Sequence, residues 1–305
     1  MNASGREPIG ISILSAMRDE ELYVTEMIES VQGQDFANWE LLVVDDGSID
    51  RTAEIVSAFA SRDPRVTLVA SGSPVGKVRA FNMAYAASSG RIVVLLAGDD
   101  RIPAGSLGKR YRAVAELSSD RPAVGYFKIR TFSEDPRSDN LTLPRGTKGS
   151  RSGGSISMNR ALADLLFPIP ESLVAEDIWL GHSSELLASE IAESPEIVLE
   201  YRIHPGNSNP RNASFDKMSE SMHLRHRAWR ELADSDRLEI DEAARRMFME
   251  MWRAEELRHA RRLFALAKFN KVSVSQRIAL LSMAHPVLFA VRKRLFRYIS
   301  GRRGR

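Results

Sequence analysis

The sequence of 305 residues contains no cysteine. This absence excludes disulfide bonds, thiolate catalysis and cysteine-ligated zinc. Residues 1–8 lack the apolar core of a secretion signal, so we expect a cytoplasmic protein. An apolar stretch near the C-terminus, residues 278–291, is only 14 residues long, whereas a membrane-spanning helix needs about 20.

Several catalytic and nucleotide-binding motifs are absent as well. No glycine fingerprint of a dinucleotide-binding fold follows the first predicted strand. Neither a His-Glu-x-x-His zinc motif nor a Gly-x-Ser-x-Gly nucleophile elbow occurs. Residues 72–77 look like a phosphate loop, but Val78 stands where that loop requires Ser or Thr. The chemical signal therefore rests on carboxylates.

The most informative carboxylates are Asp99 and Asp100, which closely follow the consecutive apolar residues 92–96. Such a run is typical of a strand buried on both faces. Two adjacent like charges are costly unless a cation or hydrogen-bond donors compensate them. Hard oxygen ligands at the end of a central strand favour Mg²⁺ or Mn²⁺ together with phosphates. An Asp-rich turn after a strand is the simpler explanation.

Alternating apolar strands and amphipathic helices predict the fold. Buried strands are expected at residues 9–14, 39–44, 66–69, 91–96 and 123–129. Helices are expected at residues 22–32, from 50 onward, 77–88 and 103–117. This order is typical of an α/β protein with a parallel, doubly wound sheet. The second strand ends in Asp45 and Asp46, so both acidic clusters should open onto one edge of the sheet.

The rest of the chain divides into a loop-rich segment and a helical region. Residues 133–155 are poor in apolar side chains and predict a mobile loop that orders over a substrate. Further elements are expected as helices at 157–166 and 176–189, a strand at 197–204, and helices at 216–233, 240–267 and 274–298. We therefore expect one α/β domain at residues 1–214 and a basic helical region at 215–305.

Charge is distributed unevenly between these two parts. Residues 215–305 hold 21 Lys and Arg against 11 Asp and Glu, whereas residues 1–214 hold 22 against 29. Residues 292–305, which follow the apolar stretch, contain seven basic residues and no acidic one. This pattern fits an anionic membrane surface, and hence a peripheral position at the inner face of the cell membrane. A packed helical appendage with a solvated basic end explains it as well, and no nucleic-acid-binding motif accompanies the charge.

Five segments in order resemble the motifs of family 2 glycosyltransferases, which have the GT-A fold. The segments are 43–52 (Val-Val-Asp-Asp-Gly-Ser-Ile-Asp-Arg-Thr), 77–82, 96–103, the pair 176–177, and 201–206. The resemblance extends over residues 8–210. It implies a Rossmann-like domain with a mostly parallel sheet, a nucleotide-sugar donor, a divalent metal such as Mg²⁺ or Mn²⁺, and inversion at the anomeric carbon.

The resemblance also implies roles for individual residues. Asp99, Asp100 and His204 would hold the metal. Asp177 would be the general base for the acceptor hydroxyl, with Glu176 as the second choice. The donor would be bound by Ala16, Arg18, Glu20, Asp46, Lys77 and Asp99.

Each role has a structural alternative, and the sequence departs from the family pattern at one position. Asp46 could cap a turn, and the pair 176–177 could be the acidic first turn of a helix. Ala97 stands where many relatives carry the first acid of an Asp-x-Asp motif. We expect an inverting glycosyltransferase that builds surface polysaccharide or glycolipid on a glycan or lipid-linked acceptor. The alternative is a catalytically inactive relative that binds a glycan or a protein partner.

Overall fold

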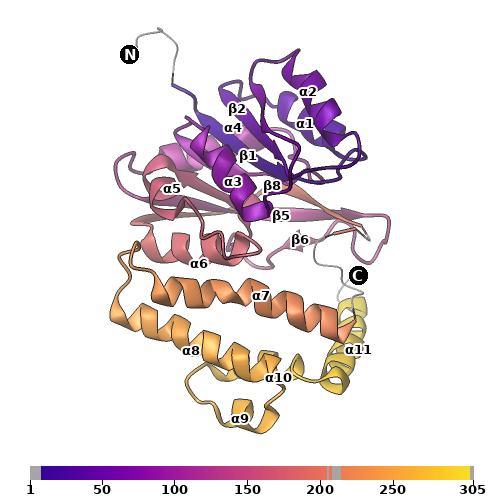
Figure 1. Cartoon of the computed structure of the whole chain (residues 1–305), viewed down its shortest axis with the longest axis vertical. Coiled ribbons are helices and arrows are strands. Elements are labelled where there is room, and N and C mark those ends of the chain that lie inside the picture. Colours follow the sequence, from indigo (N-terminus) through magenta and orange to yellow (C-terminus); the bar gives the residue numbers. More distant parts are fainter. Residues whose placement is uncertain (1–7, 205, 208–213, 303–305) are drawn as a thin grey trace. The chain divides into compact units, whose positions relative to one another are not determined.

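The computed structural model describes residues 8–204, 206–207 and 214–302. Its backbone divides into two compact units, one ending at Ile203 and the other beginning at His204 (Figure 1). The sequence placed this division after residue 214. The α/β unit reaches its end with a long strand, β8 (Glu190–Ile203), which begins seven residues earlier than the expected strand at 197–204.

The first half of the α/β unit is the expected parallel sheet. It consists of β1 (Ile11–Met17), β2 (Trp39–Asp45), β3 (Val66–Ala70) and β4 (Ile92–Leu95). These strands pair in the order β3-β2-β1-β4, and every pair is parallel. All residues of β1 and β4 are buried, because helices cover both faces of the sheet.

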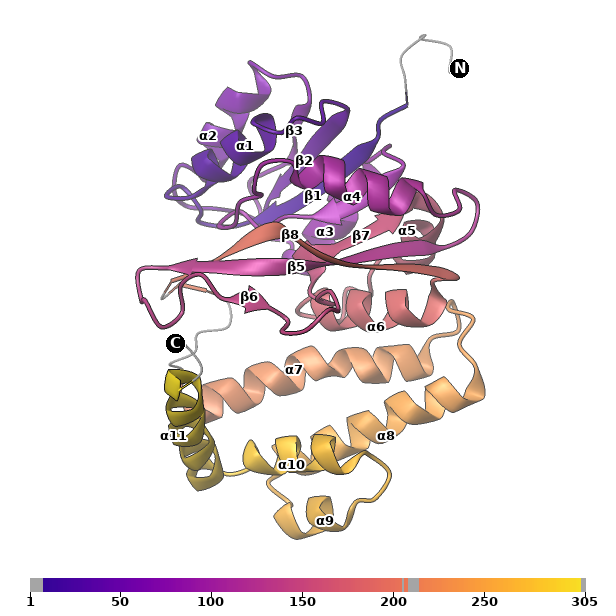
Figure 2. The ribbon, with the colours of Figure 1, turned by 180° about the vertical axis from the view of Figure 1, so that it is seen from behind.

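Helices on both faces of the sheet shield the central strands from solvent. They are α1 (Val24–Gln32), α2 (Thr52–Ala60), α3 (Lys77–Ala86) and α4 (Ser106–Ala115). The apolar stripes of α1, α2 and α4 share one hydrophobic cluster with alternate residues of the strands, such as Ile11, Ile13, Ile92 and Val94. Helix α3 packs on β1 and β2, and α4 also packs on β5, β7 and β8 (Figure 2).

The second half of the sheet is mixed. The elements are β5 (Ala123–Ser133), β6 (Thr142–Leu143), β7 (Ile156–Asn159), a 3-10 turn η1 (Gly153–Ser155), α5 (Arg160–Leu166) and α6 (Asp177–Leu187). Strand β7 lies between β4 and β5 and is antiparallel to both, whereas β8 is parallel to β5. Strand β6 pairs antiparallel with Ile129 and Arg130 of β5, so part of the loop expected at 133–155 is instead a short strand.

The predicted helix at 157–166 is wrong over its first three residues. Ile156 and Met158 are completely buried and alternate with Ser157, which is the period of a strand rather than a helix. The helical period begins only at Leu162 and Ala163. Asn159 separates the two patterns, because its side chain accepts a hydrogen bond from the Leu162 amide and caps α5.

The described residues of the C-terminal unit form helices joined by loops, without any strand. Its helices are α7 (Phe215–Asp234), α8 (Glu242–His259), α9 (Leu263–Lys268), α10 (Val274–Ser282) and α11 (Pro286–Arg302). The sequence predicted three helices here, but the second and third are each broken. Arg261 adopts a positive φ of 58°, which ends a helix. Pro286 lacks an amide proton and therefore begins α11 instead of continuing α10.

Helices α10 and α11, into which the third predicted helix is divided, contain most of the apolar stretch at residues 278–291. No single described helix combines the length and the apolar composition that crossing a membrane requires. Helix α10 and the first part of α11, Val274–Ser282 and Pro286–Leu295, meet that requirement as a pair, but they are bent by 107°.

A buried ion pair joins α7 to α8. The Arg258 guanidinium donates to Glu255 at 2.6 and 2.7 Å, and both side chains are fully buried. Arg258 also donates to the Ser219 hydroxyl at 2.8 Å and to the Ser219 carbonyl at 2.9 Å. His223 and His226 approach the other side of Glu255 at 3.4 and 3.2 Å. The carboxylate thus has partners from both helices.

We expect Arg258→Ala to lower the free energy of unfolding of the C-terminal unit by about 3–5 kcal/mol, because Glu255 would remain buried without its cation. Loss of the helical circular dichroism signal in urea measures this change. The matched control is Arg246→Ala, which removes an exposed ion pair with Glu242 on the same helix. The control should cost less than about 0.5 kcal/mol. Equal effects of the two substitutions would contradict the structural role of the buried pair.

Candidate functional site

The candidate site lies where β1, β2 and β4 end. Parallel pairing sets Met17 opposite Asp45 and Leu14 opposite Leu95, so the loops after these three strands share one edge. Hydrogen bonds connect the first two loops. The Glu20 amide donates to the Thr52 hydroxyl at 2.7 Å, and the Asp19 amide donates to the Ser48 hydroxyl at 2.9 Å. The loops after β1 and β2, which both carry acidic residues, are therefore held together.

The turn after β2 is shaped by Asp46. One carboxylate oxygen, Oδ1, accepts hydrogen bonds from the amides of Val75 and Gly76 at 2.5 and 2.8 Å. These bonds fix the approach to α3. The turn also requires glycine next to Asp46, because Gly47 has a φ of +72° and a Cβ there would lie 2.7 Å from Pro74 Cδ. Asp46 thus caps a turn, as its structural alternative predicted, and its role at a nucleotide base stays a prediction.

Excess negative charge gathers beside this turn. Burial, and then the neighbouring charge of Asp99, raises the pKa of the Asp100 carboxyl well above its usual range. Burial, followed by the charges of Asp99, Asp50 and Asp19, raises the pKa of Glu20 to about 8. Gly98 allows the close approach of the two loops, since a Cβ there would lie 2.9 Å from Glu20 Cγ. The edge favours a cation.

Two basic side chains partly compensate the acids. Lys77, the first residue of α3, places Nζ 3.0 Å from Glu176 Oε1. Its charge, like that of Arg202, also lowers the pKa of Asp100, so α3 and the loop after β4 face the same space. The Arg202 amide donates to Asp100 Oδ1 at 2.8 Å. Cations from both α3 and β8 therefore act on the acidic pair.

Glu176 and Asp177 differ in environment. Glu176 precedes α6, is 7% exposed and holds Lys77, while its second oxygen, Oε2, is buried and makes no hydrogen bond to the described residues. Gly153 lies against it, with 3.6 Å between an ideal Cβ and Oε1. Asp177 is the first residue of α6 and is half-buried. Of the two carboxylates, Asp177 is the more accessible.

The remaining predicted residues are less closely connected. Ala16 is buried in β1, and Arg18 is largely exposed and forms an ion pair with Asp19 at 3.6 Å. His204 begins the second unit, and its amide donates to the Asn207 side chain at 2.7 Å. Its role as a metal ligand stays a prediction.

The donor atoms present suit a hard divalent cation that is shared with a ligand. Among the described residues, no group of three or more His, Asp or Glu side chains is arranged to hold a metal. Mg²⁺, however, is commonly bound through one or two carboxylates plus substrate phosphates. Asp99 and Asp100 fit that requirement, because their charges are close and the burial of Asp100 makes its own charge costly.

Sequence reasoning missed the basic side chain that supports these acids. Arg202 was noticed only as part of the segment 201–206, without a role. Its partner Glu26 gave no signal, since it occupies the polar face of an ordinary amphipathic helix. The two residues are 176 positions apart in the sequence. A pattern search within one sequence has no means of pairing them.

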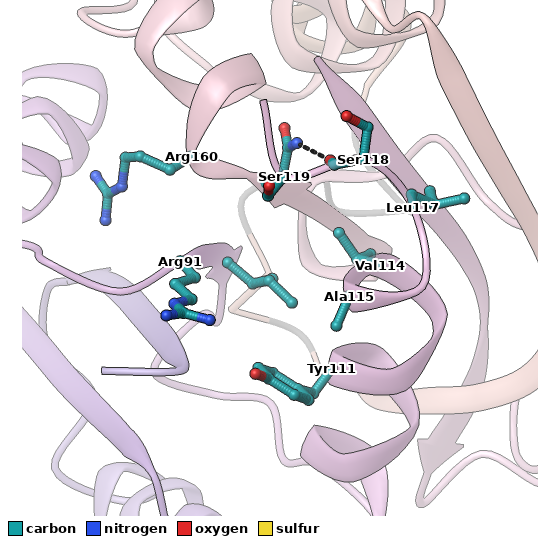
Figure 3. Close-up of a pocket in the computed structure, with 10 residues that line it drawn as sticks. Arg91, Tyr111, Val114, Ala115, Leu117, Ser118, Ser119 and Arg160 are labelled. Atoms are coloured by element: carbon teal, nitrogen blue, oxygen red, sulfur yellow. Dashed lines mark hydrogen bonds between the residues drawn. The ribbon is translucent and has the colours of Figure 1, made fainter. Parts of the chain in front are cut away.

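A hollow occurs at the opposite end of β4 (Figure 3). Its lining includes Ile92, Tyr111 and Val114 with Arg91 and Arg160 at its side. The Arg160 guanidinium is already bonded to the Gly90 carbonyl at 2.6 and 2.9 Å. No Asp or Glu is among the residues that line this hollow, so it does not offer the carboxylate ligands that the edge after β4 supplies for a cation.

Sequence comparison identifies one family. The sequence model for glycosyl transferase family 2 matches residues 12–162. Glycosyltransferase GlyG of Streptococcus pneumoniae is 28% identical over 117 residues, which are 38% of this chain and 39% of GlyG. The Escherichia coli UDP-Glc:α-D-GlcNAc-diphosphoundecaprenol β-1,3-glucosyltransferase WfgD is 38% identical over 90 residues, or 30% of this chain and 35% of WfgD. The chain thus spans less than half of these curated relatives.

Solved structures support the fold over most of the chain. Staphylococcus aureus TarS 1–349 in complex with UDP-GlcNAc aligns with a TM-score of 0.60 and 20% identity, over 92% of this chain and 83% of that chain. The mannosyltransferase PcManGT from Pyrobaculum calidifontis, in complex with GDP-Man and Mn²⁺, aligns with a TM-score of 0.58 and 16% identity, over 94% and 87%. The expected GT-A fold with a helical C-terminal region is confirmed.

The glycine after Asp46 gives a prediction for the site's architecture. We expect Gly47→Ala to destabilise the α/β unit by more than Gly146→Ala. Both glycines have positive φ, which costs about 1–3 kcal/mol for alanine, but only Gly47 would also press a Cβ against Pro74. Urea denaturation followed by tryptophan fluorescence measures the difference. Equal losses would show that Pro74 moves aside freely.

Proposed function

The chain belongs to glycosyl transferase family 2, and we propose that it transfers a sugar from a nucleotide-diphosphate donor to an acceptor hydroxyl with inversion at the anomeric carbon. The observation that carries this proposal is the meeting of Asp99, Asp100 and Lys77 at one sheet edge, with Lys77 paired to the residue before Asp177. The donors named for related proteins, UDP-Glc, UDP-GlcNAc and GDP-Man, agree with this class of substrate.

The donor would occupy the edge between the loops after β1, β2 and β4. Ala16, Arg18, Glu20 and Asp46 would line the nucleoside part, and Lys77 would approach the diphosphate. Asp99 and Asp100, with His204 as a further ligand, would hold Mg²⁺ or Mn²⁺. When bound there, the ion would neutralise negative charge on the departing nucleoside diphosphate.

Asp177 is the proposed general base. The acceptor oxygen attacks the anomeric carbon and loses its proton to the Asp177 carboxylate, while the bond from that carbon to the diphosphate breaks and the diphosphate takes the electron pair. Glu176 is less suited to this role, because one of its oxygens holds Lys77. Its other oxygen, Oε2, is buried and therefore closed to an incoming acceptor hydroxyl.

Surface polysaccharide or glycolipid is the proposed product. WfgD is named for a diphosphoundecaprenol-linked sugar acceptor, so a lipid-linked or glycan acceptor is consistent with relatives of this kind. The alternative, an inactive binding protein, is favoured only by Ala97, which places no carboxylate before Gly98. Release of nucleoside diphosphate from UDP-Glc, UDP-GlcNAc or GDP-Man in the presence of Mn²⁺ distinguishes the two. No release from any donor sugar would support the inactive alternative.

The proposed base and the proposed metal ligands should respond differently to substitution. We expect Asp177→Asn to lower the rate of transfer by about 10²–10⁴-fold and to leave donor affinity unchanged, because only proton removal is affected. Asp99→Asn should weaken Mn²⁺-dependent donor binding. Calorimetric titration and product analysis measure both. If Glu176→Gln alone lowered transfer without affecting donor binding, the two carboxylates would have exchanged roles.

We also propose that α10 and α11 contact an anionic membrane surface. Apolar side chains are exposed on both helices, among them Ile278 at 62%, Val287 at 62% and Val291 at 48%. Residues 257–305 contain 13 Lys and Arg and no Asp or Glu. Such a combination of exposed apolar side chains and unopposed basic charge is typical of interfacial helices.

The double variant Lys293→Gln, Arg294→Gln should therefore bind vesicles of anionic lipid about thirtyfold more weakly, since each basic residue contributes about 1 kcal/mol. Co-sedimentation of the 305-residue chain with vesicles at low salt measures this effect, and high salt should release the wild type. The control, Arg227→Gln with Arg230→Gln on α7, removes the same charge elsewhere. Equal binding of wild type to neutral and anionic vesicles would contradict the proposal.

A further inference from the structure

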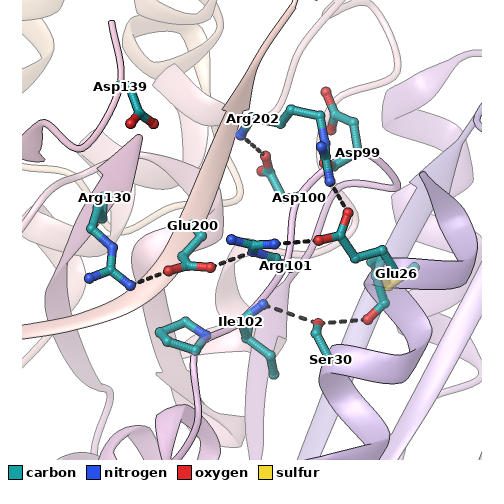
Figure 4. Close-up of polar contacts among 12 residues, drawn as sticks. Glu26, Ser30, Asp99, Asp100, Arg101, Ile102, Arg130, Asp139, Glu200 and Arg202 are labelled. Atoms are coloured by element: carbon teal, nitrogen blue, oxygen red, sulfur yellow. Dashed lines mark hydrogen bonds and ion pairs between the residues drawn. The ribbon is translucent and has the colours of Figure 1, made fainter. Parts of the chain in front are cut away.

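A chain of ion pairs runs from the acidic pair into the body of the α/β unit (Figure 4). Arg202 on β8 pairs with Glu26 on α1, and Glu26 also pairs with Arg101. Arg101 in turn pairs with Glu200, which receives Arg130 from β5. This series of ion pairs thus connects four parts of the fold: α1, the loop after β4, β5 and β8.

Arg202 is the member that touches the acidic pair. Its backbone amide donates to Asp100 Oδ1 at 2.8 Å, and its side-chain Nε donates to the Asp99 carbonyl at 2.8 Å. One residue therefore restrains both acids, the first through its peptide group and the second through its carboxylate. Nη2 of the guanidinium donates to Glu26.

The guanidinium of Arg202 is held in a fixed orientation. Its side chain is 17% exposed, and its Cζ lies 4.5 Å from the centre of the Tyr23 ring and 4.3 Å from that of Phe132. Glu26 is fixed in turn, because Arg101 and Arg202 donate to different oxygens of its carboxylate. A planar guanidinium with two aromatic neighbours and directed donors loses little freedom per hydrogen bond.

The loop that carries the acids is fastened to β8 at a second point. The Arg101 amide donates to the Glu200 carbonyl at 3.2 Å, and the Glu200 amide donates to the Arg101 carbonyl at 2.8 Å. Together with Arg202 these bonds fix the path of residues 99–101. Without them the two like-charged side chains would turn away from each other, since their repulsion opposes a convergent arrangement.

We propose that Arg202 and Glu26 are positioning residues that hold Asp99 and Asp100 in the arrangement that binds a divalent cation together with a nucleoside diphosphate. This inference rests on the proposed function. Glu26 acts through Arg202, and Arg202 acts through the Asp99 carbonyl and the Asp100 carboxylate. Groups that orient metal ligands in this way commonly contribute about 10–100-fold to metal affinity.

The test measures Mn²⁺ affinity of the 305-residue chain in saturating UDP and, separately, in saturating GDP. Glu26→Gln keeps the shape of the side chain and removes its charge, and Arg202→Lys keeps the charge and removes the fork of donors. Each variant should weaken Mn²⁺ binding by about 10–100-fold while the melting temperature without metal stays close to that of the wild type. The double variant should be no weaker than Arg202→Lys, because both substitutions break one shared interaction.

Arg130→Gln is the matched control. It removes an arginine from the far end of the same chain of ion pairs, where the partner is Glu200 and not the acidic pair. Mn²⁺ affinity should be unchanged in this variant. Equal weakening by Arg130→Gln and Glu26→Gln would overturn the inference in favour of general stabilisation of the unit.

The same titrations separate this inference from the proposed function. If the wild type binds Mn²⁺ and nucleotide together but both Glu26→Gln and Arg202→Lys leave that affinity unchanged, the inference is wrong and the proposed function stands. If Arg202→Lys weakens binding and Glu26→Gln does not, Arg202 meets the ligand directly and the positioning role is overturned. If the wild type binds neither UDP nor GDP with Mn²⁺, the metal-dependent function itself fails.

Discussion

Repulsion among carboxylates at one edge of the sheet is the main electrostatic cost in the α/β unit, and other residues of the unit must compensate it. Glu20, Asp99 and Asp100 converge there because β1 and β4 are parallel neighbours and end at the same edge. The raised pKa values of Glu20 and Asp100 show that burial and mutual charge are not fully compensated within the protein. A site of this kind gains stability when a cation enters, and a cation that remains partly open to solvent attracts phosphate oxygens.

The compensation that the protein does supply comes from elements distant in sequence. Lys77 reaches the site from α3 and Arg202 reaches it from β8, so the acids are balanced only after the second half of the sheet has formed. Strand β8 is paired with β5 over nearly its whole length, which gives Arg202 a rigid base. The geometry of the acidic pair therefore depends on the complete sheet rather than on the turn in which the acids lie.

Features of the fold that rest on local sequence patterns could be predicted, whereas those that rest on contacts between distant residues could not. The strands β1 to β4 and the shared edge of Asp46 and Asp99 were predictable, because an apolar run followed by acids is a local pattern. Strand β7 was not, since Ile156 and Met158 offer only two alternating apolar residues before a helix begins. The pairing of Glu26 with Arg202 could not be predicted either, because neither residue departs from what a surface helix or a strand end ordinarily carries.

Arg110 is a buried charged residue whose structural role becomes clear only from its contacts in the folded protein. Its guanidinium is fully buried and donates to the carbonyls of Gly154 at 2.6 Å and Ile156 at 3.2 Å, and to the Ser157 hydroxyl at 3.1 Å. Burial lowers its pKa to about 9. These bonds hold the turn and the strand that the sequence misread. Gly153, the first residue of that turn, lies against Glu176, so a core arginine supports the wall of the candidate site.

In the helical unit, acidic and basic residues are separated along the sequence. The arginine that this unit buries, Arg258, has its carboxylate Glu255 one helical turn away, and Arg261 pairs with Asp216 on α7. Both pairs draw on acids that precede residue 257, because none follows. Helices α10 and α11 are therefore basic segments without acids of their own, and they carry exposed apolar side chains alongside that charge. Unpaired basic charge would be costly in a protein interior, and exposed apolar side chains would be costly in water. Their coexistence on two helices that are bent by 107° relative to each other is what an interface that is both anionic and partly apolar would stabilise.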